Sequence, residues 1–267
     1  MNKQQFEQTI KPELVLSSPP PQQHPNPRNI TINSQGYQDF SELLSKLSLA
    51  GEVSTSIAHE VRNPMTTVRG LAQLLAMEHP EKLGYYQLMI EEIDRADQVL
   101  SEFLCLAKNS PITFSEVMLN DILRRSVDLL YSQIIHRDIH LHIYLSNDVC
   151  LYADESKLIL VFMHIVKNAI EASQPGGNVF IQTRSGCNSV QVRIVDEGIG
   201  IKETIIHRIM EPFFTTKEGS TGLGLSVAYR IIENHNGSLM INSLPNIGTI
   251  VEVSFPVLAA DPETELA

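Results

Sequence analysis

The first half of the chain carries apolar residues at helical spacing. Between about residues 37 and 77 they recur every three or four positions, which places them within about 40° of one line on a helix. The members of this first stripe are Val53, Ile57, Val61, Pro64, Val68, Leu71 and Leu75. A second stripe follows the His79-Pro80 break and comprises Met89, Ile93, Ala96, Leu100, Phe103 and Ala107. The pattern predicts two long helices joined by a short turn.

A helical hairpin of this kind cannot bury both apolar stripes by itself. Two copies bury them in a four-helix bundle, so we expect a homodimer. Pro64 lacks the backbone N–H that a helix interior uses, which predicts a kink in the first helix. Pro111 should end the second helix.

Beyond Pro111 the periodicity alternates between the values typical of helices and of strands. Helices are predicted over 119–133, 155–173 and about 224–236, and strands over 139–145, 178–184, 189–195, 238–243 and 249–255. Asp154 is a candidate N-cap for the helix at 155–173. Strands with helices on one face form an α/β sandwich, so the whole chain is of the α+β class: a two-helix hairpin dimerising into a bundle, followed by a sandwich domain.

The two ends of the chain differ in composition from the rest. Residues 17–29 read SSPPPQQHPNPRN and contain almost nothing apolar. Such a segment buries too little surface to offset its ordering entropy, which favours a disordered leader over a proline-motif docking site. We therefore expect a disordered proline-rich leader at 1–36, the helical domain at 37–111, the sandwich domain at 112–258 and a flexible tail at 259–267.

Charge and composition exclude several classes of protein. The chain has 267 residues and a net charge of −11, with 31 acidic and 20 basic side chains, so it offers no basic surface for nucleic acid. Cys105, Cys150 and Cys187 are widely separated, which indicates reduced thiols rather than disulfides or a zinc site. No apolar run approaches the roughly 18 residues of a membrane span, and no signal peptide is visible, so we expect a cytoplasmic protein.

His59 is the first residue with candidate chemistry. On the helical projection it lies about 200° from Ile57, opposite the apolar stripe and therefore in water. A neutral imidazole is a nucleophile near pH 7, and the neighbouring Glu60 carboxylate could fix its tautomer. Asn63 lies four residues on and hence on the same face. An exposed helical histidine is usually only a surface residue, so His59 gains weight only from other motifs.

Two glycine-rich segments form a second constellation. DEGIG, at 196–200, follows a predicted strand, and GSTGLGL, at 219–225, precedes a predicted helix. Glycines let the backbone approach phosphate oxygens, and the start of a helix favours anions. Asp196 at the end of its strand could accept a hydrogen bond from the adenine amino group, which would select ATP over GTP.

A third motif, KNAIEA, lies on the predicted helix at 155–173. Asn168 offers a neutral oxygen that suits Mg²⁺, and Lys167 and Lys217 are candidate phosphate contacts. A polar residue on such a helix is as often merely hydrogen-bonded. His136, His140 and His142 lack a carboxylate or cysteine that would complete a metal site, so we interpret them as surface histidines.

Together these segments resemble the boxes of sensor histidine kinases. SIAHEVRNPMTTVRG is similar to their H box, HIVKNAIEA to the N box, DEGIG to G1, EPFFTTK to the F box and GSTGLGLS to G2, and NIGT resembles the last nucleotide-binding box. All six occur in the family's order between Ser56 and Thr249. The amino-acid sequence of these boxes is most similar to that of the catalytic halves of sporulation-type kinases of endospore-forming bacteria.

The resemblance implies a dimerisation and histidine phosphotransfer domain at 37–111, followed by a GHKL-type (Bergerat) ATP-binding domain. It implies that His59 accepts the phosphoryl group from ATP, that Glu60 is its acid/base neighbour, and that Asn63 assists removal of phosphate from a response regulator receiver domain. Asn168 would bind Mg²⁺. The remaining ATP contacts that it implies are Lys167, Asp196, Gly198, Gly200, Phe214, Lys217, Gly222, Leu223, Gly224, Leu225 and Thr249, with Phe213 also in the lid.

One position departs from the family pattern. Sensor histidine kinases usually have a second Asn four residues before Asn168, where this chain has His164. An imidazole is a poor Mg²⁺ ligand, so the departure puts the rate of autophosphorylation in doubt. Neither a sensor domain nor a receiver domain is visible, so a separate sensor protein is a further expected partner.

Three alternatives stay open at this stage. The chain could be a weak kinase that mainly dephosphorylates or sequesters a regulator. It could be a purely structural dimerisation module, although the intact glycine boxes argue against this. It could also be another ATPase of the superfamily, such as a chaperone or mismatch-repair type, but those lack the His59 helix.

Overall fold

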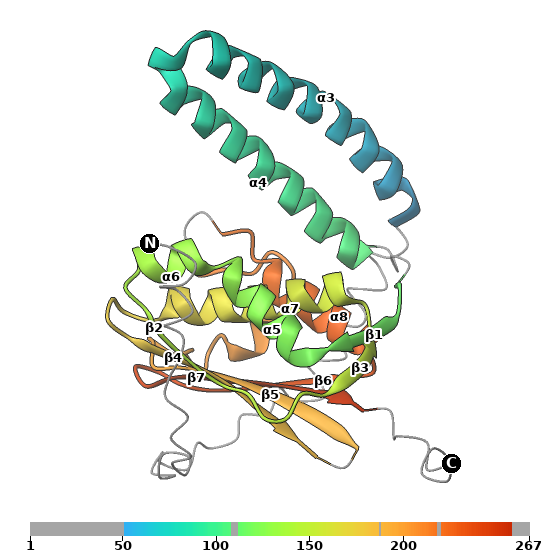
Figure 1. Cartoon of the computed structure of the whole chain (residues 1–267), viewed down its shortest axis with the longest axis vertical. Coiled ribbons are helices and arrows are strands. Elements are labelled where there is room, and N and C mark those ends of the chain that lie inside the picture. The colour runs from blue at the N-terminus through green and yellow to red at the C-terminus, as the bar shows by residue number, and fades with distance from the viewer. Residues whose placement is uncertain (1–50, 108–111, 187, 218–219, 258–267) are drawn as a thin grey trace.

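The computed structural model describes residues 51–107, 112–186, 188–217 and 220–257, and the side chains of residues 51–59 and 107 lie outside that description. The chain forms a long helical hairpin that stands on an α/β domain (Figure 1). The expected leader at 1–36, the first turns of the helix expected from residue 37 and the tail expected at 259–267 all fall outside the described residues.

The hairpin consists of two antiparallel helices joined by a 3-10 turn. Their bounds are α3 Gly51–Glu78, η1 Pro80–Lys82 and α4 Leu83–Ala107. Arg62 Nε lies 2.7 Å from Asp97 Oδ1, and Arg69 pairs with Asp94, so charged residues fix the register of α3 against α4. Helix α3 continues through Pro64 without a break. The prediction of two long helices is confirmed over the described residues.

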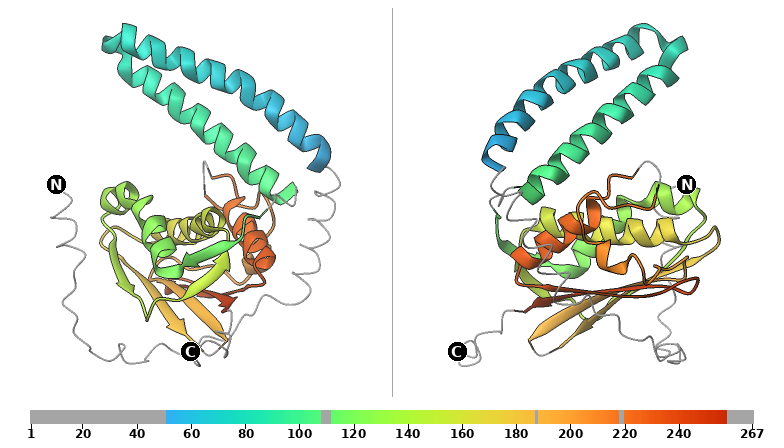
Figure 2. Two further views of the ribbon diagram at one scale, coloured as in Figure 1. Left: turned by 45° about the vertical axis from the view of Figure 1, so that its right-hand side comes forward. Right: turned by 180° about the vertical axis from the view of Figure 1, so that it is seen from behind.

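Much of the first apolar stripe is exposed in a single chain. Val61, Val68, Leu71 and Leu75 have exposed fractions between 40% and 55%, and of the described side chains of α3 only Ala72 is buried. Helix α4 contacts α3 along one side (Figure 2) but does not cover the stripe. Apolar surface of this extent on a helix indicates a further packing partner.

The second domain is a five-stranded sheet with helices on one face. The strand order is β2-β4-β5-β7-β6, with β2 parallel to β4 and the remaining pairs antiparallel. Its strands are β2 His140–Tyr144, β4 Asn178–Ser185, β5 Ser189–Asp196, β6 Ser238–Leu244 and β7 Gly248–Pro256. Its helices are α5 Leu119–Asp128, α6 Tyr131–His136, α7 Glu155–Ala172 and α8 Gly224–Asn234, with a 3-10 turn η2 Ile206–Arg208. The predicted fold class is confirmed.

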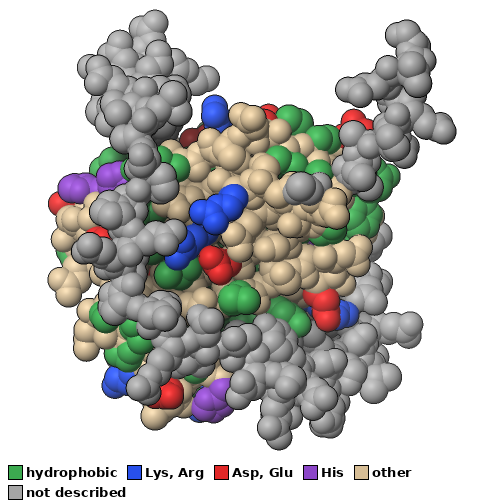
Figure 3. All heavy atoms as spheres, turned by 90° about the horizontal axis from the view of Figure 1, so that it is seen from below, with side chains coloured by type: hydrophobic (Ala, Val, Ile, Leu, Met, Phe, Trp, Pro, Cys, Tyr) green, Lys and Arg blue, Asp and Glu red, His purple; other side chains and the backbone are tan. Residues whose placement is uncertain are grey.

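Alternation along the strands decides which face the helices cover. In β5, Val190, Val192 and Ile194 are buried beneath the helices, while the residues between them are half-buried on the other face. Seen from the sheet side (Figure 3), backbone and uncharged polar atoms predominate, with charged and apolar side chains scattered among them. Arg193 of β5 pairs across this face with Glu252 of β7 at 3.5 Å.

Two local features differ from the sequence-based expectation. The helix predicted over 119–133 is in fact two helices, α5 and α6, because the chain turns at Leu129–Leu130 and thereby buries Leu130 while Leu129 stays exposed. A small antiparallel sheet of β1 Ser115–Met118 and β3 Cys150–Ala153 was not predicted. Its strands have four residues each, too short for a clear alternation.

The cap of α7 follows the sequence-based prediction. Asp154 Oδ1 accepts the backbone N–H of Lys157 at 3.1 Å, and its second oxygen accepts from Thr113. The backbone N–H of Asp154 donates to His235 Nε2 at 3.0 Å, which ties the start of α7 to the end of α8. No helix within the described ranges has the length and apolar character that crossing a bilayer requires.

Candidate functional site

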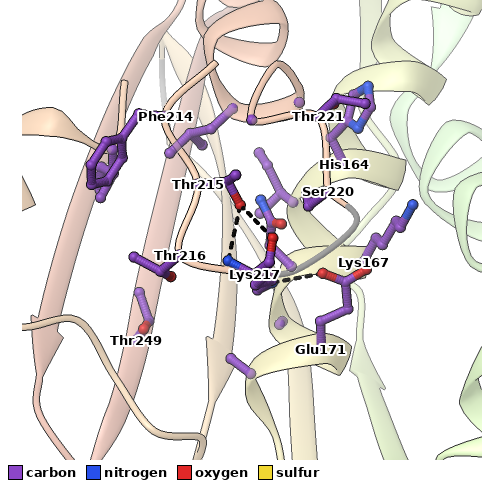
Figure 4. Close-up of a pocket in the computed structure, with 18 of the residues that line it drawn as sticks. His164, Lys167, Glu171, Phe214, Thr215, Thr216, Lys217, Ser220, Thr221 and Thr249 are labelled. Atoms are coloured by element: carbon purple, nitrogen blue, oxygen red, sulfur yellow. Dashed lines mark hydrogen bonds and ion pairs between the residues drawn. The ribbon is translucent and has the colours of Figure 1, made fainter. Parts of the chain in front are cut away.

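A cavity of about 490 Å³ opens beside the sheet ends, between α7, α8 and the end of α4. Residues from every motif singled out in the sandwich domain contribute to its lining, among them Lys167, Asn168, Asp196, Gly200, Phe214, Lys217, Gly222, Gly224, Leu225 and Thr249. Figure 4 shows several of these side chains converging on one space. The fold thus brings together segments that are widely separated in the sequence.

Asp196 is the buried acidic group of this cavity. It ends β5 with an exposed fraction of 6%, and burial raises the pKa of its carboxyl to about 6 although the Gly198 N–H partly opposes the shift. That N–H donates to Oδ1 at 2.9 Å. Thr249 lies opposite Asp196 in the β5–β7 register, and its hydroxyl is 3.0 Å from Ser243 Oγ. A buried carboxylate at a cavity wall can recognise a ligand N–H.

Two of the glycines are required by the backbone of the loops. Gly200 has a φ of 62°, and a Cβ there would lie 2.0 Å from the carbonyl oxygen of Leu244. Gly222 has a φ of 68°, and a Cβ there would lie 2.6 Å from the carbonyl carbon of Phe213. Both positions combine a left-handed conformation with close backbone packing, which only glycine permits.

Helix α7 contributes four polar side chains to the cavity lining, those of His164, Lys167, Asn168 and Glu171. The Asn168 side chain is exposed in the cavity rather than buried in the core, so its amide oxygen is available to a ligand. Lys217, from the segment before α8, lies with Nζ 2.6 Å from Oε2 of Glu171. In Figure 4 Lys217 and Glu171 point toward each other, while Lys167 projects from the far side of Glu171. Sequence reasoning did not single out Glu171.

The segment before α8 forms the outer wall. Arg208 lies over the ring of Phe214 at 4.4 Å from its centroid, and Phe213, with a φ of 66°, has its ring 6.3 Å from that of Phe103 of α4. Leu223 is fully buried just before α8, whereas Leu225 is half-buried at the cavity. Gly198 lies in the turn below, where it packs against Ala172.

Helix α4 supplies one wall of the cavity, which the sequence did not predict. Glu102 is buried at 4% exposure and lies with Oε1 3.4 Å from Nε2 of His164. Its position off the apolar stripe of α4 gives no sequence signal, because the residues that bury it come from the other domain. Burial lowers the pKa of His164, against the opposite effect of the Glu102 carboxylate.

His59, Glu60 and Asn63 lie on α3, apart from this cavity. Glu60 and Asn63 are exposed, and among the described residues that line the cavity none comes from α3. Arg62 Nη2 donates to Ser101 Oγ at 3.0 Å, so in the antiparallel hairpin His59 lies at about the level of residues 101–104 of α4. The end of α4 that borders the cavity is therefore level with His59.

The histidines at 136, 140 and 142 do not converge. His136 and His140 are exposed, whereas His142 is half-buried, with Nε2 3.0 Å from Asn178 Oδ1 and its ring stacked on Phe180. Within the described part of the chain, no group of three or more His, Cys, Asp or Glu side chains has a geometry that would hold a metal ion. Cys105 is half-buried and Cys150 exposed, both as free thiols.

Two protein families match the chain. Residues 50–111 match the His Kinase A (phospho-acceptor) domain, and residues 153–259 match the family described as histidine kinase-, DNA gyrase B-, and HSP90-like ATPase. Together the two matches include the candidate phospho-acceptor helix and the cavity.

Curated relatives extend the similarity over most of the chain. Sporulation kinase E of Bacillus subtilis (strain 168) is 39% identical over 227 residues, which is 82% of this chain and 31% of the relative. Sporulation kinase C of the same organism is 39% identical over 214 residues, 79% of this chain and 50% of the relative. The chain thus spans 31% and 50% of the length of these two relatives.

Solved structures show the same architecture. The catalytic domain of histidine kinase ThkA is 32% identical with a TM-score of 0.51, covering 54% of this chain and 96% of that one. ThkA in complex with the response regulator protein TrrA is 29% identical with a TM-score of 0.57, covering 83% of this chain and 66% of that one. Full-length ShkA in complex with AMPPNP, at 22% identity, has a TM-score of 0.68 and shows the shared fold.

Proposed function

We propose that this chain, which belongs to the sensor histidine kinase family, transfers the γ-phosphoryl group of ATP to His59 and then to an aspartate of a response regulator. The observation that carries the proposal is the cavity, which combines a buried carboxylate, glycine loops and an accessible amide on one side of a phospho-acceptor hairpin.

The cavity fits an adenine nucleotide in size and chemistry. A volume of about 490 Å³ is that of an ordinary small-molecule site. Asp196 would accept a hydrogen bond from the adenine amino group when ionised. Guanine has a carbonyl at that position and would leave the buried carboxylate unpaired, which is a costly arrangement and would select ATP over GTP.

The phosphates would lie toward α8. Gly222 and Gly224 line the cavity at the start of this helix, where N–H groups favour anions. Lys217 and Lys167 lie at the cavity and would neutralise phosphate charge. Asn168 and a phosphate oxygen would hold Mg²⁺, which supplies charge neutralisation during transfer.

His59 would receive the phosphoryl group on α3. A neutral imidazole is nucleophilic near pH 7, and the adjacent Glu60 carboxylate would hold its tautomer. Transfer then depends mainly on position and electrostatics. Because the end of α4 that borders the cavity is level with His59, a limited movement of the ATPase domain along the bundle would bring the phosphate to the imidazole.

The partners follow from the exposed surfaces and from the relatives. The exposed stripe of Val61, Val68, Leu71 and Leu75 supports a homodimer through a four-helix bundle. The complex of ThkA with the response regulator protein TrrA supports a receiver domain as a second partner. A separate sensor protein is a further proposed partner.

The decisive experiment is incubation of the purified chain with radiolabelled ATP and Mg²⁺. Wild type should acquire label in an acid-labile bond, as a phosphoramidate does, and His59→Gln should lose it. His79→Gln is the matched control, since His79 is an exposed histidine at the other end of the same hairpin. Full labelling of His59→Gln would defeat the assignment.

One observation favours a second function, namely net removal of phosphate from the regulator. His164 stands where the family usually has an Asn and faces Glu102 instead of the solvent of the cavity. Asn63 is exposed one turn beyond His59, as a residue that orients an attacking water would be. Measuring label gained by His59 and label lost from a phosphorylated regulator separates the two functions, and Asn63→Ala should abolish only the second.

A further inference from the structure

Glu102 belongs to the hairpin by sequence and to the nucleotide cavity by position. Its carboxylate is 4% exposed and lines the cavity together with Asn168 and Asp196. Oε1 accepts from Gln98 Nε2 at 2.8 Å, and Oε2 accepts from the Thr221 hydroxyl at 3.3 Å. Helix α4, one of the two helices of the hairpin, thus places a carboxylate in the cavity proposed to bind ATP.

The start of α8 is where this anion lies. Thr221 Oγ1 donates to Glu102 and accepts the N–H of Leu223 at 3.3 Å, at the entrance to the helix. The free N–H groups of a helix start hold carboxylates and phosphates alike. The proposed function places the phosphates of ATP at this same helix start. Glu102 therefore lies where the phosphates of the nucleotide are proposed to bind.

His164 closes the contact from the other side. Its Nε2 is buried, makes no hydrogen bond within the described part of the chain and faces Glu102 Oε1 at 3.4 Å. Its ring also packs against Gly224, where a Cβ would lie 2.8 Å from Nδ1. An Asn side chain is shorter than a His side chain, so an Asn at position 164 would extend less far from α7 toward Glu102 of α4.

Apolar contacts hold α4 in place around the polar group. Leu106 of α4 is 1% exposed within the core of the ATPase domain, and the rings of Phe103 and Phe213 lie 6.3 Å apart. The described contacts of Glu102 include no Lys or Arg. Thr221 and Gln98 donate hydrogen bonds to the buried carboxylate, and His164 Nε2 lies 3.4 Å from it. Burying a carboxylate without a cationic partner costs free energy, so Glu102 stays buried only while these hydrogen bonds and the apolar packing compensate for its lost hydration.

We propose that Glu102 is an internal competitor for the phosphate end of the nucleotide, held by the Thr221 hydroxyl and packed against His164, so that ATP entry and release of the ATPase domain from α4 are coupled. The inference rests on the proposed function for the location of the phosphates. Because the nucleotide phosphates would displace Glu102, nucleotide binding would shift the equilibrium toward the state in which the ATPase domain has left α4.

The test is equilibrium binding of a fluorescent non-hydrolysable ATP analogue to the full chain, in the presence of Mg²⁺. Glu102→Gln keeps the shape and removes the charge, and it should bind the analogue at least about fivefold more tightly than wild type, the lower end of ordinary coupling between sites. Glu91→Gln is the matched control, because Glu91 is an exposed glutamate on the same helix, and its affinity should equal that of wild type.

A double-variant cycle tests whether His164 acts through the same contact. His164→Asn should also tighten binding. Combining it with Glu102→Gln should add little further affinity, because both substitutions remove the same Glu102–His164 contact. Equal affinity of wild type and Glu102→Gln, or weaker affinity of Glu102→Gln with its thermal unfolding unchanged, would overturn the inference. Absence of binding by every variant would instead defeat the proposed function.

Discussion

Lys217 Nζ lies 2.6 Å from Glu171 Oε2, so an ion pair joins the segment before α8 to the last turn of α7. Lys217 also acts electrostatically on Asp196, whose pKa its charge lowers against the larger effect of burial. The ammonium thus acts on two of the carboxylates of the cavity, Glu171 and Asp196. A nucleotide phosphate arriving there would compete with Glu171 for the same cation.

Replacing Lys217 should therefore weaken nucleotide binding. Lys217→Met removes a charge-assisted contact and should raise the Kd for an ATP analogue about tenfold or more. Lys202→Met serves as the control, because Lys202 is an exposed lysine on the chain between β5 and η2 and lies outside the cavity lining. Titration calorimetry measures both, and an unchanged Kd for Lys217→Met would remove Lys217 from the phosphate site.

Asp196 should affect folding and binding in opposite directions. Burial raises the pKa of its carboxyl from 3.8 to about 6, so between these values the native state binds more protons than the unfolded state. The stability contribution of this group therefore falls as the pH rises from about 4 to about 6, by about 3 kcal/mol in total, and stays low above that range. Asp196→Asn should raise the free energy of unfolding at pH 8 and much less at pH 4.

Nucleotide affinity should follow the ionisation of the same carboxylate. In wild type the affinity for the ATP analogue should fall as the pH drops from 7 to 5, because protonated Asp196 is a weaker acceptor for the adenine amino group. In Asp196→Asn the affinity should be about tenfold lower at pH 7, and this pH dependence should be lost. Parallel pH profiles for the two proteins would contradict the assignment of Asp196.

The two left-handed glycines at 200 and 176 offer a matched comparison. Both have positive φ, but a Cβ at Gly200 would lie 2.0 Å from Leu244 O, whereas a Cβ at Gly176 meets nothing within 4 Å. Gly176→Ala should cost about 1 kcal/mol of stability through its backbone conformation alone. Gly200→Ala should cost more than twice as much in urea denaturation, and equal losses would show that the loop adapts to the added carbon.

The exposed stripe of α3 should decide the oligomeric state. Leu71 is 55% exposed in the single chain, so a charge there is harmless to a monomer but is buried in a four-helix bundle. Leu71→Glu should halve the mass measured by sedimentation equilibrium, while Gln73→Glu, an exposed position off the stripe, should leave it unchanged. A Leu71→Glu protein that keeps the mass of wild type would place the dimer contact elsewhere.

The sequence by itself determined the features that depend on short-range pattern. Helical spacing predicted α3 and α4, the N-cap position predicted the start of α7 at Asp154, and alternation predicted β5 over 189–195, one residue short of its end at Asp196. These are local relations among residues a few positions apart, where the period of the backbone fixes which side chains share a face. The resemblance of the glycine-rich segments to boxes of sensor histidine kinases added a predicted role in ATP binding for each of them.

Only the tertiary structure decided which residues meet across the two domains. Glu102 contacts His164 and Thr221, the latter 119 positions away in the chain, and nothing in the local pattern of α4 indicates this. The short strands β1 and β3 exist because they pair with each other, since neither carries a period of its own. Burial of a polar group depends on what packs against it from elsewhere, so long-range contacts, and not spacing, determine its environment.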